Sequence, residues 1–520
     1  MRWTGIGGDA QTSSVAWRAA GLVLFVLAVV LRVVALDAKA LWFDETVSVL
    51  FASLPVARAL LVIGANDPHP PLYYLLLHAW MGVFGDGETA VRSLSVFLGA
   101  PVVLLTWLFG RRLLGPAPAL LAAALVALAP SQVAAAQEAR MYGLLTLAAV
   151  GSWWALWAAL GVPGARHAGT ATSARRPWAV YAAATAVMLY SHYYGVLVVV
   201  SQVGYLIWWR PGAGVWRRAL SAWCGVALAF LPWGPLFAQQ LAGGRAWPAH
   251  RIPLSAATLP DTLAAMTVGR PVLEAWGPRL STIQPIGTSW PAVLGMAAAA
   301  ALAVAAVRTP SVSRRIVALL LAAALGPPVV AFAVSLELNV YAPRYLLFIV
   351  PAVALLVAAG AASLIAGPTR WLRAAGVILS VLVVMPNVTG TLAFHRQPRL
   401  DVFDWRLISR TLAAHARDDD AIVFLPGFSR IPVDYYFRGP HRRVVLTPDG
   451  ADVVGPEGAR LAGVVESLSR HPRVWILTVP PIPEALERLT RALDRRSYRV
   501  ARREAVNMAV LILLERDHPP

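Results

Sequence analysis

The sequence predicts an all-α polytopic membrane protein with a small C-terminal α/β domain, and three observations support this fold class. Of the 520 residues, 58% are hydrophobic and 14% are charged. Apolar stretches recur along the chain at about 20 residues, the length that crosses a hydrocarbon core. Charges become frequent only after about residue 391. A single apolar stretch would fit a buried core helix, but a series of them indicates repeated membrane crossing.

Length and hydropathy predict about eleven transmembrane helices. Arg2 and the first apolar run resemble a secretory signal, but the run exceeds the usual length of a signal's apolar core. We therefore expect an uncleaved first span and a cytoplasmic N-terminus. The expected spans are residues 17–36, 92–110, 117–136, 141–160, 177–191, 193–209, 219–238, 289–307, 316–336, 345–366 and 372–389.

Residues 70–84 are also apolar, but the arginine distribution argues against a span there. If they crossed the membrane, Arg111 and Arg112 would face outward and every later basic cluster would be inverted. The stretch is short, and it carries Tyr73 and Trp80, which favour the membrane interface. We predict an in-plane or re-entrant helix here, which puts the arginine clusters in the cytoplasm.

The formal net charge of +18 does not indicate nucleic-acid binding. Most arginines of the membrane part lie in short clusters between apolar runs, as in cytoplasmic loops that face anionic lipid. Cys224 is the single cysteine, so an intrachain disulfide and a cysteine metal cluster are excluded. The sequence contains no GxGxxG, P-loop or HExxH motif.

Two domains are expected, residues 1–390 in the membrane and residues 391–520 outside the cytoplasm. In the second domain, helix-like stretches alternate with strand-like ones, which predicts a small α/β fold. The helix-like stretches are 404–416, 458–469 and 484–493, and the strand-like ones are 421–425, 444–446, 474–479 and 510–514.

Five polar clusters lie at the predicted outer face. Each has an ordinary structural explanation: acids favour the first turn of a helix, arginines snorkel, and tyrosines form interfacial belts. Together they bring carboxylates, arginines, histidines and tyrosines to one side of the membrane. The clusters are Asp44 with Glu45, Asp67 to Tyr74 including His69 and Tyr73, Glu138 with Arg140 and Tyr142, His192 with Tyr193, and Arg344 with Tyr345.

The order of these motifs resembles the C-type (GT-C) glycosyltransferases over about residues 15–390. The motifs are Trp-Phe-Asp44-Glu45, His69-Pro-Pro-Leu-Tyr-Tyr, Ala-Val-Arg92-Ser-Leu-Ser, Gln-Glu138-Ala-Arg140-Met-Tyr142 and Pro-Arg344-Tyr-Leu. The resemblance is to the bacterial family 39 and aminoarabinose-transferase-like branch, which includes protein O-mannosyltransferases. It implies a polyprenyl-phosphate-sugar donor, transfer outside the cytoplasm, and Asp44 as the catalytic carboxylate.

Some relatives bind a metal near the position of His69. Here an Asp-Glu pair and an incomplete ligand set leave metal dependence open, with a divalent metal as the one candidate cofactor. In the expected reaction Asp44 is the base for an acceptor hydroxyl. Arg140 and Arg344 hold the leaving phosphate. Glu45 orients Asp44 or the acceptor, and Glu138 holds Arg140. The residues expected to line the sugar and acceptor site are Asp67, His69, Tyr73, Tyr74, Glu138, Tyr142, His192 and Tyr193.

The expected function is inverting transfer of one mannose or arabinose-like sugar to a glycan, lipid or protein hydroxyl, in a bacterial cytoplasmic membrane. The chain is rich in alanine, arginine and tryptophan, which suggests a GC-rich bacterial genome. In such a bacterium decaprenyl-phosphate mannose or arabinose is a plausible donor. A transporter or flippase of lipid-linked sugars, a polysaccharide polymerase or ligase, and a non-catalytic scaffold stay open as alternatives. Residues 241–288 are expected to form either a lid over the lipid donor or a plain connector.

Overall fold

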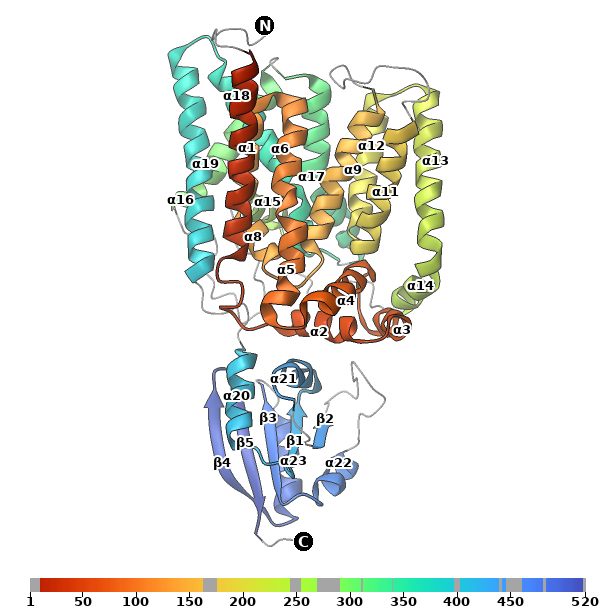
Figure 1. Ribbon diagram of the computed structural model, residues 1–520, viewed down its shortest axis with the longest axis vertical. Helices are drawn as coiled ribbons and strands as arrows, with labels where there is room; N and C mark the ends of the chain where they lie inside the picture. Colours follow the sequence, from red (N-terminus) through yellow and green to blue (C-terminus); the bar gives the residue numbers. More distant parts are fainter. Residues whose placement is uncertain are drawn as a thin grey trace. The chain divides into compact units, whose positions relative to one another are not determined.

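The computed structural model of the chain describes residues 10–161, 175–243, 254–268, 290–309, 312–338, 340–396, 403–438, 442–445, 461–479 and 483–517. The chain forms two compact units (Figure 1). Unit 1 comprises Met1–Leu36 and Ile63–Arg396, and unit 2 comprises Asp37–Val62 and Gln397–Pro520. Unit 2 therefore combines the segment that follows the first helix with the C-terminal part of the chain.

Unit 1 is a bundle of long helices with short helices at the end away from the N-terminus (Figure 1). The short 3₁₀ segments η1 (Leu231–Trp233) and η3 (Pro343–Ile349) precede α14 and α18. The helices are α1 (Ala10–Val33), α4 (Leu72–Phe84), α5 (Glu88–Gly99), α6 (Pro101–Leu114), α7 (Pro116–Leu128), α8 (Pro130–Ala136), α9 (Tyr142–Ala159), α11 (Arg175–Ser191), α12 (Gly195–Trp209), α13 (Ala213–Phe230), α14 (Gly234–Ala242), α15 (Thr258–Val268), α16 (Trp290–Arg308), α17 (Arg314–Leu338), α18 (Val350–Ile365) and α19 (Arg370–Arg396).

The chain is a multi-pass membrane protein, but the expected number of about eleven spans is not confirmed. Among the described residues, eight helices are long and apolar enough to cross a membrane, or nine if the bent pair α7 and α8 is one span. Helices form at all eleven expected positions, but α11 and α12 have only 17 and 15 residues. Periodicity and hydropathy locate a helix well, whereas its ends depend on capping and on neighbouring loops.

The break between α7 and α8 has a local cause. Pro130 has no N–H group and cannot continue the hydrogen bonding of α7, so the carbonyls at the end of α7 need other donors. Arg32 of α1 supplies them: its Nη1 donates to Ala127 O at 3.3 Å and its Nη2 to Val126 O at 3.2 Å. Thr391 of α19 donates to Leu128 O at 2.7 Å. The polar side chains of two other helices thus satisfy the bent end.

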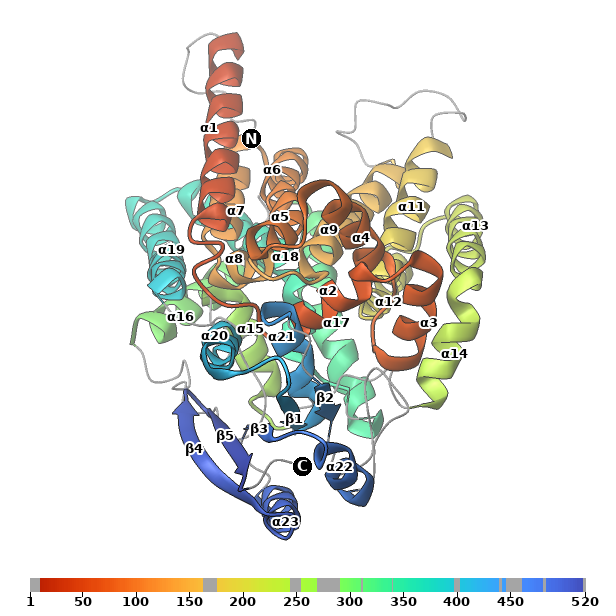
Figure 2. The same cartoon turned by 60° about the horizontal axis from the view of Figure 1, so that its bottom comes forward.

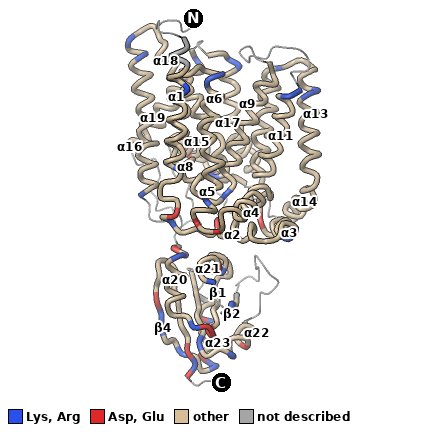
Figure 3. The backbone as a smooth tube through the Cα atoms, in the orientation of Figure 1, with Lys and Arg blue, Asp and Glu red and all other residues tan. Residues whose placement is uncertain are grey.

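The basic residues of unit 1 gather at the end of the bundle near the N-terminus, opposite α4 (Figure 3). Two of them, Arg111 and Arg112, end α6, and Arg175 and Arg176 begin α11. Others lie near α13, α16, α17 and α19, where apolar side chains face outward from the bundle, as surfaces in contact with lipid do.

Unit 2 contains a five-stranded sheet in the order β2-β1-β3-β5-β4, in which β2, β1 and β3 are parallel and β5 and β4 are antiparallel to their neighbours. Helices α20 and α21 cover one face, and α22 and α23 cover the other (Figure 2). The elements are β1 (Ala421–Leu425), β2 (Arg442–Val445), β3 (Arg473–Thr478), β4 (Tyr498–Val506), β5 (Ala509–Arg516), α20 (Trp405–His415), η4 (Gly427–Ser429), α21 (Arg430–Tyr436), α22 (Leu461–Leu468) and α23 (Pro483–Asp494).

Side chains of β1 alternate between the two cores of this sheet. Ile422 and Phe424 pack with Trp405 of α20, whereas Val423 packs with Leu489 of α23. This confirms the predicted small α/β fold. Strand β4 and helix α21 were not predicted: β4 is an edge strand whose side chains are mostly exposed and often charged, so its sequence lacks an apolar pattern.

Unit 2 also includes α2 (Phe43–Ser53) and the start of α3 (Val56–Asn66), which continues into unit 1. Helix α2 packs against α21. The segment that carries Asp44 and Glu45 thus folds together with elements much later in the chain. The Leu41 N–H, for example, donates to the hydroxyl of Tyr436, 395 residues away.

Candidate active site

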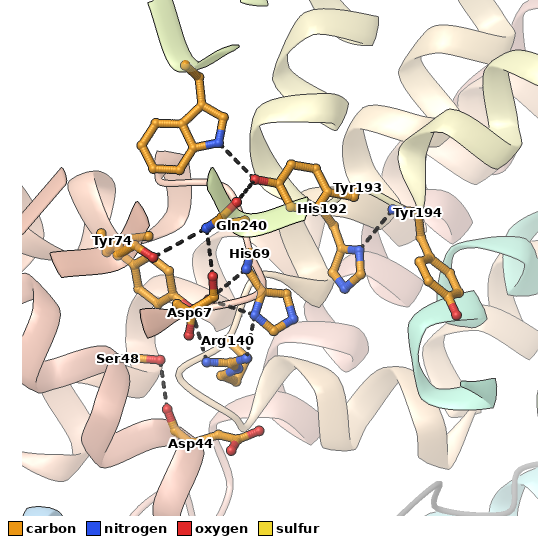
Figure 4. Close-up of polar contacts among 12 residues, drawn as sticks. Asp44, Ser48, Asp67, His69, Tyr74, Arg140, His192, Tyr193, Tyr194 and Gln240 are labelled. Atoms are coloured by element: carbon orange, nitrogen blue, oxygen red, sulfur yellow. Dashed lines mark hydrogen bonds and ion pairs between the residues drawn. The ribbon is translucent and has the colours of Figure 1, made fainter. Parts of the chain in front are cut away.

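A buried polar cluster lies at the end of unit 1 that holds α4 (Figure 4). Its members come from three turns: Asp67 and His69 from the turn between α3 and α4, Arg140 from the turn between α8 and α9, and His192 from the turn between α11 and α12. The exposed fraction of each is between 3% and 5%. Buried charged groups in a membrane protein are costly and usually functional, so this cluster is the candidate active site.

The turn that carries Asp67 is set by its prolines. Pro68, Pro70 and Pro71 prevent α3 from continuing, and the Asp67 carboxylate organises the resulting turn. Asp67 Oδ1 accepts the backbone N–H of His69 at 2.8 Å, lies 2.8 Å from His69 Nδ1, and accepts the Tyr74 hydroxyl at 3.1 Å. Burial favours the neutral acid, but His69 and Arg140 outweigh it and lower the pKa of Asp67. Asp67 is therefore a carboxylate.

The Arg140 guanidinium sits against the same group. Its Nη1 donates to the Tyr74 hydroxyl at 3.1 Å, and its Nη2 lies 3.3 Å from His69 Nδ1. The Arg140 carbonyl accepts from the Ser95 hydroxyl at 3.2 Å, and that hydroxyl lies 2.7 Å from the Tyr73 hydroxyl. Helices α4 and α5 thus fix both ends of Arg140. Glu138 is also buried, and its carbonyl accepts the Arg140 N–H at 2.7 Å.

His192 faces this cluster as a neutral hydrogen-bond donor. Its Nδ1 accepts the backbone N–H of Tyr194 at 3.0 Å, so the proton resides on Nε2. Nε2 is buried and has no hydrogen-bond partner among the described residues. Burial, followed by the charges of His69, Arg140 and Arg344, holds the pKa of His192 well below its usual value.

Aromatic rings and a second arginine complete the site. The Tyr345 ring lies 4.5 Å from the ring of His192, 5.7 Å from that of His69 and 6.2 Å from that of Tyr142. The Arg344 guanidinium carbon is 5.4 Å from the Tyr142 ring centroid. Both Arg344 and Tyr345 belong to η3, which begins the span that contains α18. Arg344 is 9% exposed, so a second cation is buried next to the cluster.

Gln240 of α14 ties three segments of the site together. Its Nε2 donates to Asp67 O at 2.6 Å, and its Oε1 accepts the Tyr193 hydroxyl. The Tyr193 hydroxyl also accepts from Trp233 Nε1 at 2.8 Å. Gln240 and the central place of Tyr345 were not predicted from the sequence. The pair Gln239 and Gln240 in a largely apolar helix was a usable signal for the first.

The predicted site residues fall into two groups. Unit 1 brings together nine of them, and Glu138 lies two residues before Arg140; the nine are Asp67, His69, Tyr73, Tyr74, Arg140, Tyr142, His192, Tyr193 and Arg344. Asp44 and Glu45 belong to unit 2.

Glu45 has a clear structural role in unit 2. It is fully buried, and its Oε2 accepts the Trp42 N–H at 3.2 Å, so it caps the start of α2. Asp44 is half-buried, and its carbonyl accepts the Ser48 hydroxyl at 2.9 Å (Figure 4).

Within the described residues, no group of three or more histidine, cysteine, aspartate or glutamate side chains is placed to hold a metal ion. The expected lid, residues 241–288, lies largely outside the described residues. Residues 241–243 and 254–268 are the described parts of it, and the Tyr341 hydroxyl donates to Thr262 Oγ1 of α15 at 2.9 Å.

The protonation of His192 predicts a pH-dependent stability. Its pKa lies well below 6.5 in the folded protein. Below pH of about 6.5 the unfolded chain therefore binds a proton that the folded chain does not, and stability falls by up to about 1.4 kcal/mol per pH unit. We expect His192→Gln to flatten the dependence of the apparent Tm on pH between about 6.5 and 5. His78→Gln, at a half-buried histidine on α4, is the control, and equal slopes in wild type and His192→Gln would contradict this assignment.

A sequence profile of the family described as dolichyl-phosphate-mannose-protein mannosyltransferase matches residues 68–237. The matched range includes His69, Arg140 and His192 but not Asp44 or Arg344. Among curated protein sequences, none matches the chain.

Solved structures similar to this chain share its fold over most of its length. ArnT from Cupriavidus metallidurans in the apo state aligns with a TM-score of 0.62 at 14% identity, covering 97% of this chain and 98% of that one. The same enzyme bound to undecaprenyl phosphate aligns with a TM-score of 0.61 at 14% identity, with the same coverage. The oligosaccharyltransferase of Archaeoglobus fulgidus aligns with a TM-score of 0.55 at 11% identity, covering 89% of this chain and 69% of that one. The chain therefore has the fold of the GT-C membrane glycosyltransferases and resembles the branch that contains ArnT and the protein mannosyltransferases.

Proposed function

We propose that the protein transfers one sugar from a polyprenyl-phosphate donor to an acceptor hydroxyl, with inversion at the anomeric carbon. The observation that carries this proposal is the buried cluster of Asp67, His69, Tyr74 and Arg140 with Arg344 beside it. The cluster occurs in a fold shared with ArnT, one structure of which is bound to undecaprenyl phosphate.

The two arginines suit a leaving phosphate. Arginine stays charged when buried and can grip phosphate oxygens through two N–H groups. Arg140 contacts Tyr74 and His69, the two side chains that also contact the Asp67 carboxylate, so its position is fixed before a ligand binds. Arg344 adds a second cation nearby. Such preorganised charge stabilises the anion that develops as the sugar–phosphate bond breaks. The leaving phosphate is a weak base and needs this stabilisation more than it needs a proton.

The neutral groups of the cluster suit the sugar. The Nε2–H of His192 is a donor for a sugar hydroxyl, and the rings of Tyr142 and Tyr345 offer apolar faces. Asp67 and His69, with Tyr73, Tyr74 and Tyr193, hold this wall in shape through the hydrogen bonds described above. Sugar discrimination would then depend on which hydroxyl meets His192.

Asp44 is proposed as the base that takes the proton of the acceptor hydroxyl. The assignment rests on its place directly after the first span and on the resemblance of that motif to the GT-C enzymes. Glu45, which caps α2, is proposed to keep that helix start in shape. A divalent metal stays open as a cofactor.

The arginine-rich end of unit 1 is proposed to face the cytoplasm of a bacterium, by the positive-inside rule. The cluster at the other end of unit 1 then opens to the outside, where lipid-linked sugars and a glycan, lipid or protein acceptor would meet. By the same topology α4 is an in-plane helix. The segment after α19, and with it the C-terminal domain of residues 391–520, is also outside.

The test is sugar transfer by the purified protein from radiolabelled polyprenyl-phosphate mannose and polyprenyl-phosphate arabinose, beside binding of undecaprenyl phosphate followed by tryptophan fluorescence. We expect saturable lipid-phosphate binding and release of a single sugar from one of the donors to an added acceptor. A product that grows in chain length would replace single-sugar transfer by polymerisation. Failure to bind the lipid phosphate would overturn the proposal.

A further inference from the structure

The parallel strands of unit 2 create an edge that usually binds ligands. The chain passes from β1 through α21 to β2 on one side of β1, and β3 lies on the other side. In open α/β sheets, ligands bind beyond the carboxyl ends of the strands where the order reverses in this way. Here that edge comprises η4, which follows β1 after a single proline, and the helix α21.

The occupant of this edge is a segment of the same unit, residues 37–43. The Phe43 ring meets the Phe428 ring of η4 edge to face, with centroids 5.3 Å apart. The Leu41 N–H donates to the hydroxyl oxygen of Tyr436, at the end of α21, at 2.7 Å. Arg406 Nη2 of α20 donates to the Asp37 carbonyl at 2.8 Å. Three contacts, from three elements of the C-terminal domain, therefore hold seven consecutive residues.

The edge itself is braced. Asp434 of α21 accepts from Arg430 Nε at 3.1 Å and from Arg443 Nη1 of β2. Arg443 Nη2 also donates to the Phe437 carbonyl at 2.6 Å. Helix α21, which ends at Tyr436 and directly follows the η4 segment that contains Phe428, is thereby tied to the neighbouring strand. Asp44 directly follows Phe43 and lies in the first turn of α2, which packs against α21.

We propose that the C-terminal domain is a positioning element for the reaction: its sheet edge grips residues 37–43 and thereby orients the start of α2, which carries Asp44. This inference rests on the proposed role of Asp44. Phe428 and Tyr436 are positioning residues, because they act on Asp44 through Leu41 and Phe43. The sheet edge at which such a domain usually binds a ligand is thus occupied by residues 37–43 of the same unit.

The grip is tested directly by crosslinking, without any activity measurement. In a Cys224→Ser background, Phe43→Cys with Phe428→Cys is expected to form a disulfide or a short bismaleimide crosslink in the membrane-embedded protein, detected by mass spectrometry of proteolysed samples. Phe43→Cys with Arg470→Cys is the control, because Arg470 is exposed near the amino edge of the sheet, before β3. A folded 43/428 variant that crosslinks no better than the control would overturn the grip.

Positioning is tested by steady-state kinetics. Phe428→Ala is expected to lower kcat by about tenfold, and Tyr436→Phe by about threefold, with KM for the lipid donor unchanged, because a small misplacement of a reacting group lowers turnover rather than binding. Arg470→Ala should leave both constants unchanged. Crosslinking at 43/428 together with unchanged kcat in both variants would overturn the positioning role. Absence of sugar transfer by the wild type would instead defeat the proposed function, and the crosslink would still decide the grip.

Discussion

Asp44→Asn is expected to lower kcat by about 10²–10⁴-fold, the range that a positioned general base contributes. Asparagine keeps the size of the side chain and its contact with solvent but cannot accept the hydroxyl proton. Asp44 is half-buried in the first turn of α2, and the hydrogen bond that Ser48 makes there is to the Asp44 carbonyl, which the substitution retains. Because asparagine has the same size, we expect the variant to fold, which its apparent Tm checks, and undecaprenyl phosphate should bind as in the wild type.

Two controls make this result specific. Asp418→Asn changes an exposed acid of the same unit and should leave turnover unchanged. Glu45→Gln changes the buried neighbour whose carboxylate accepts the Trp42 N–H and caps α2. We expect this variant to lower the apparent Tm and to lower kcat much less than Asp44→Asn does. Near-normal turnover by Asp44→Asn would remove Asp44 from the mechanism but would leave a glycosyltransferase with another base.

Arg140→Gln is expected to lower kcat/KM for the lipid donor by about 10²–10³-fold, the usual effect of removing one preorganised group that stabilises developing negative charge. Arg140 is 3% exposed and its guanidinium contacts Tyr74 and His69, so water screens its charge little. Arg140→Lys keeps the charge but not the forked geometry, and it should recover only part of the loss. Binding of undecaprenyl phosphate should weaken in the same order.

The competing explanation is structural, because Arg140 also helps to keep the buried Asp67 ionised. Losing one partner of a buried charge pair costs about 3–5 kcal/mol of stability, whatever its role in catalysis. The double variant Asp67→Asn with Arg140→Gln separates the two roles. If Arg140 only balances Asp67, the apparent Tm should recover and turnover should match that of Asp67→Asn alone. If Arg140 binds the donor phosphate, the apparent Tm should recover while turnover stays well below that of Asp67→Asn alone.

The site residues that could be predicted from the sequence are polar residues in apolar surroundings. His69, Arg140 and His192 each stand out at the end of an apolar stretch, and the structure brings all three together. Gln240 was missed, although it donates to the Asp67 carbonyl. Gln239 precedes it in the same helix, so composition does not say which glutamine faces the site, and the distance of 173 residues to Asp67 leaves no local pattern to connect them.

The sequence by itself determined the fold class, the helix positions and the gathering of the arginine clusters at one end of the helix bundle. These features follow from local composition. A membrane span must be apolar over its whole length, and in the α/β domain apolar residues recur with the period of a helix or of a strand in successive segments. Tertiary structure alone decided that residues 37–62 fold with the C-terminal domain, and that Arg32 and Thr391 donate to the carbonyls at the end of α7. It also revealed β4, an exposed edge strand. Each of these depends on contacts between distant residues, whose free energies no local pattern encodes.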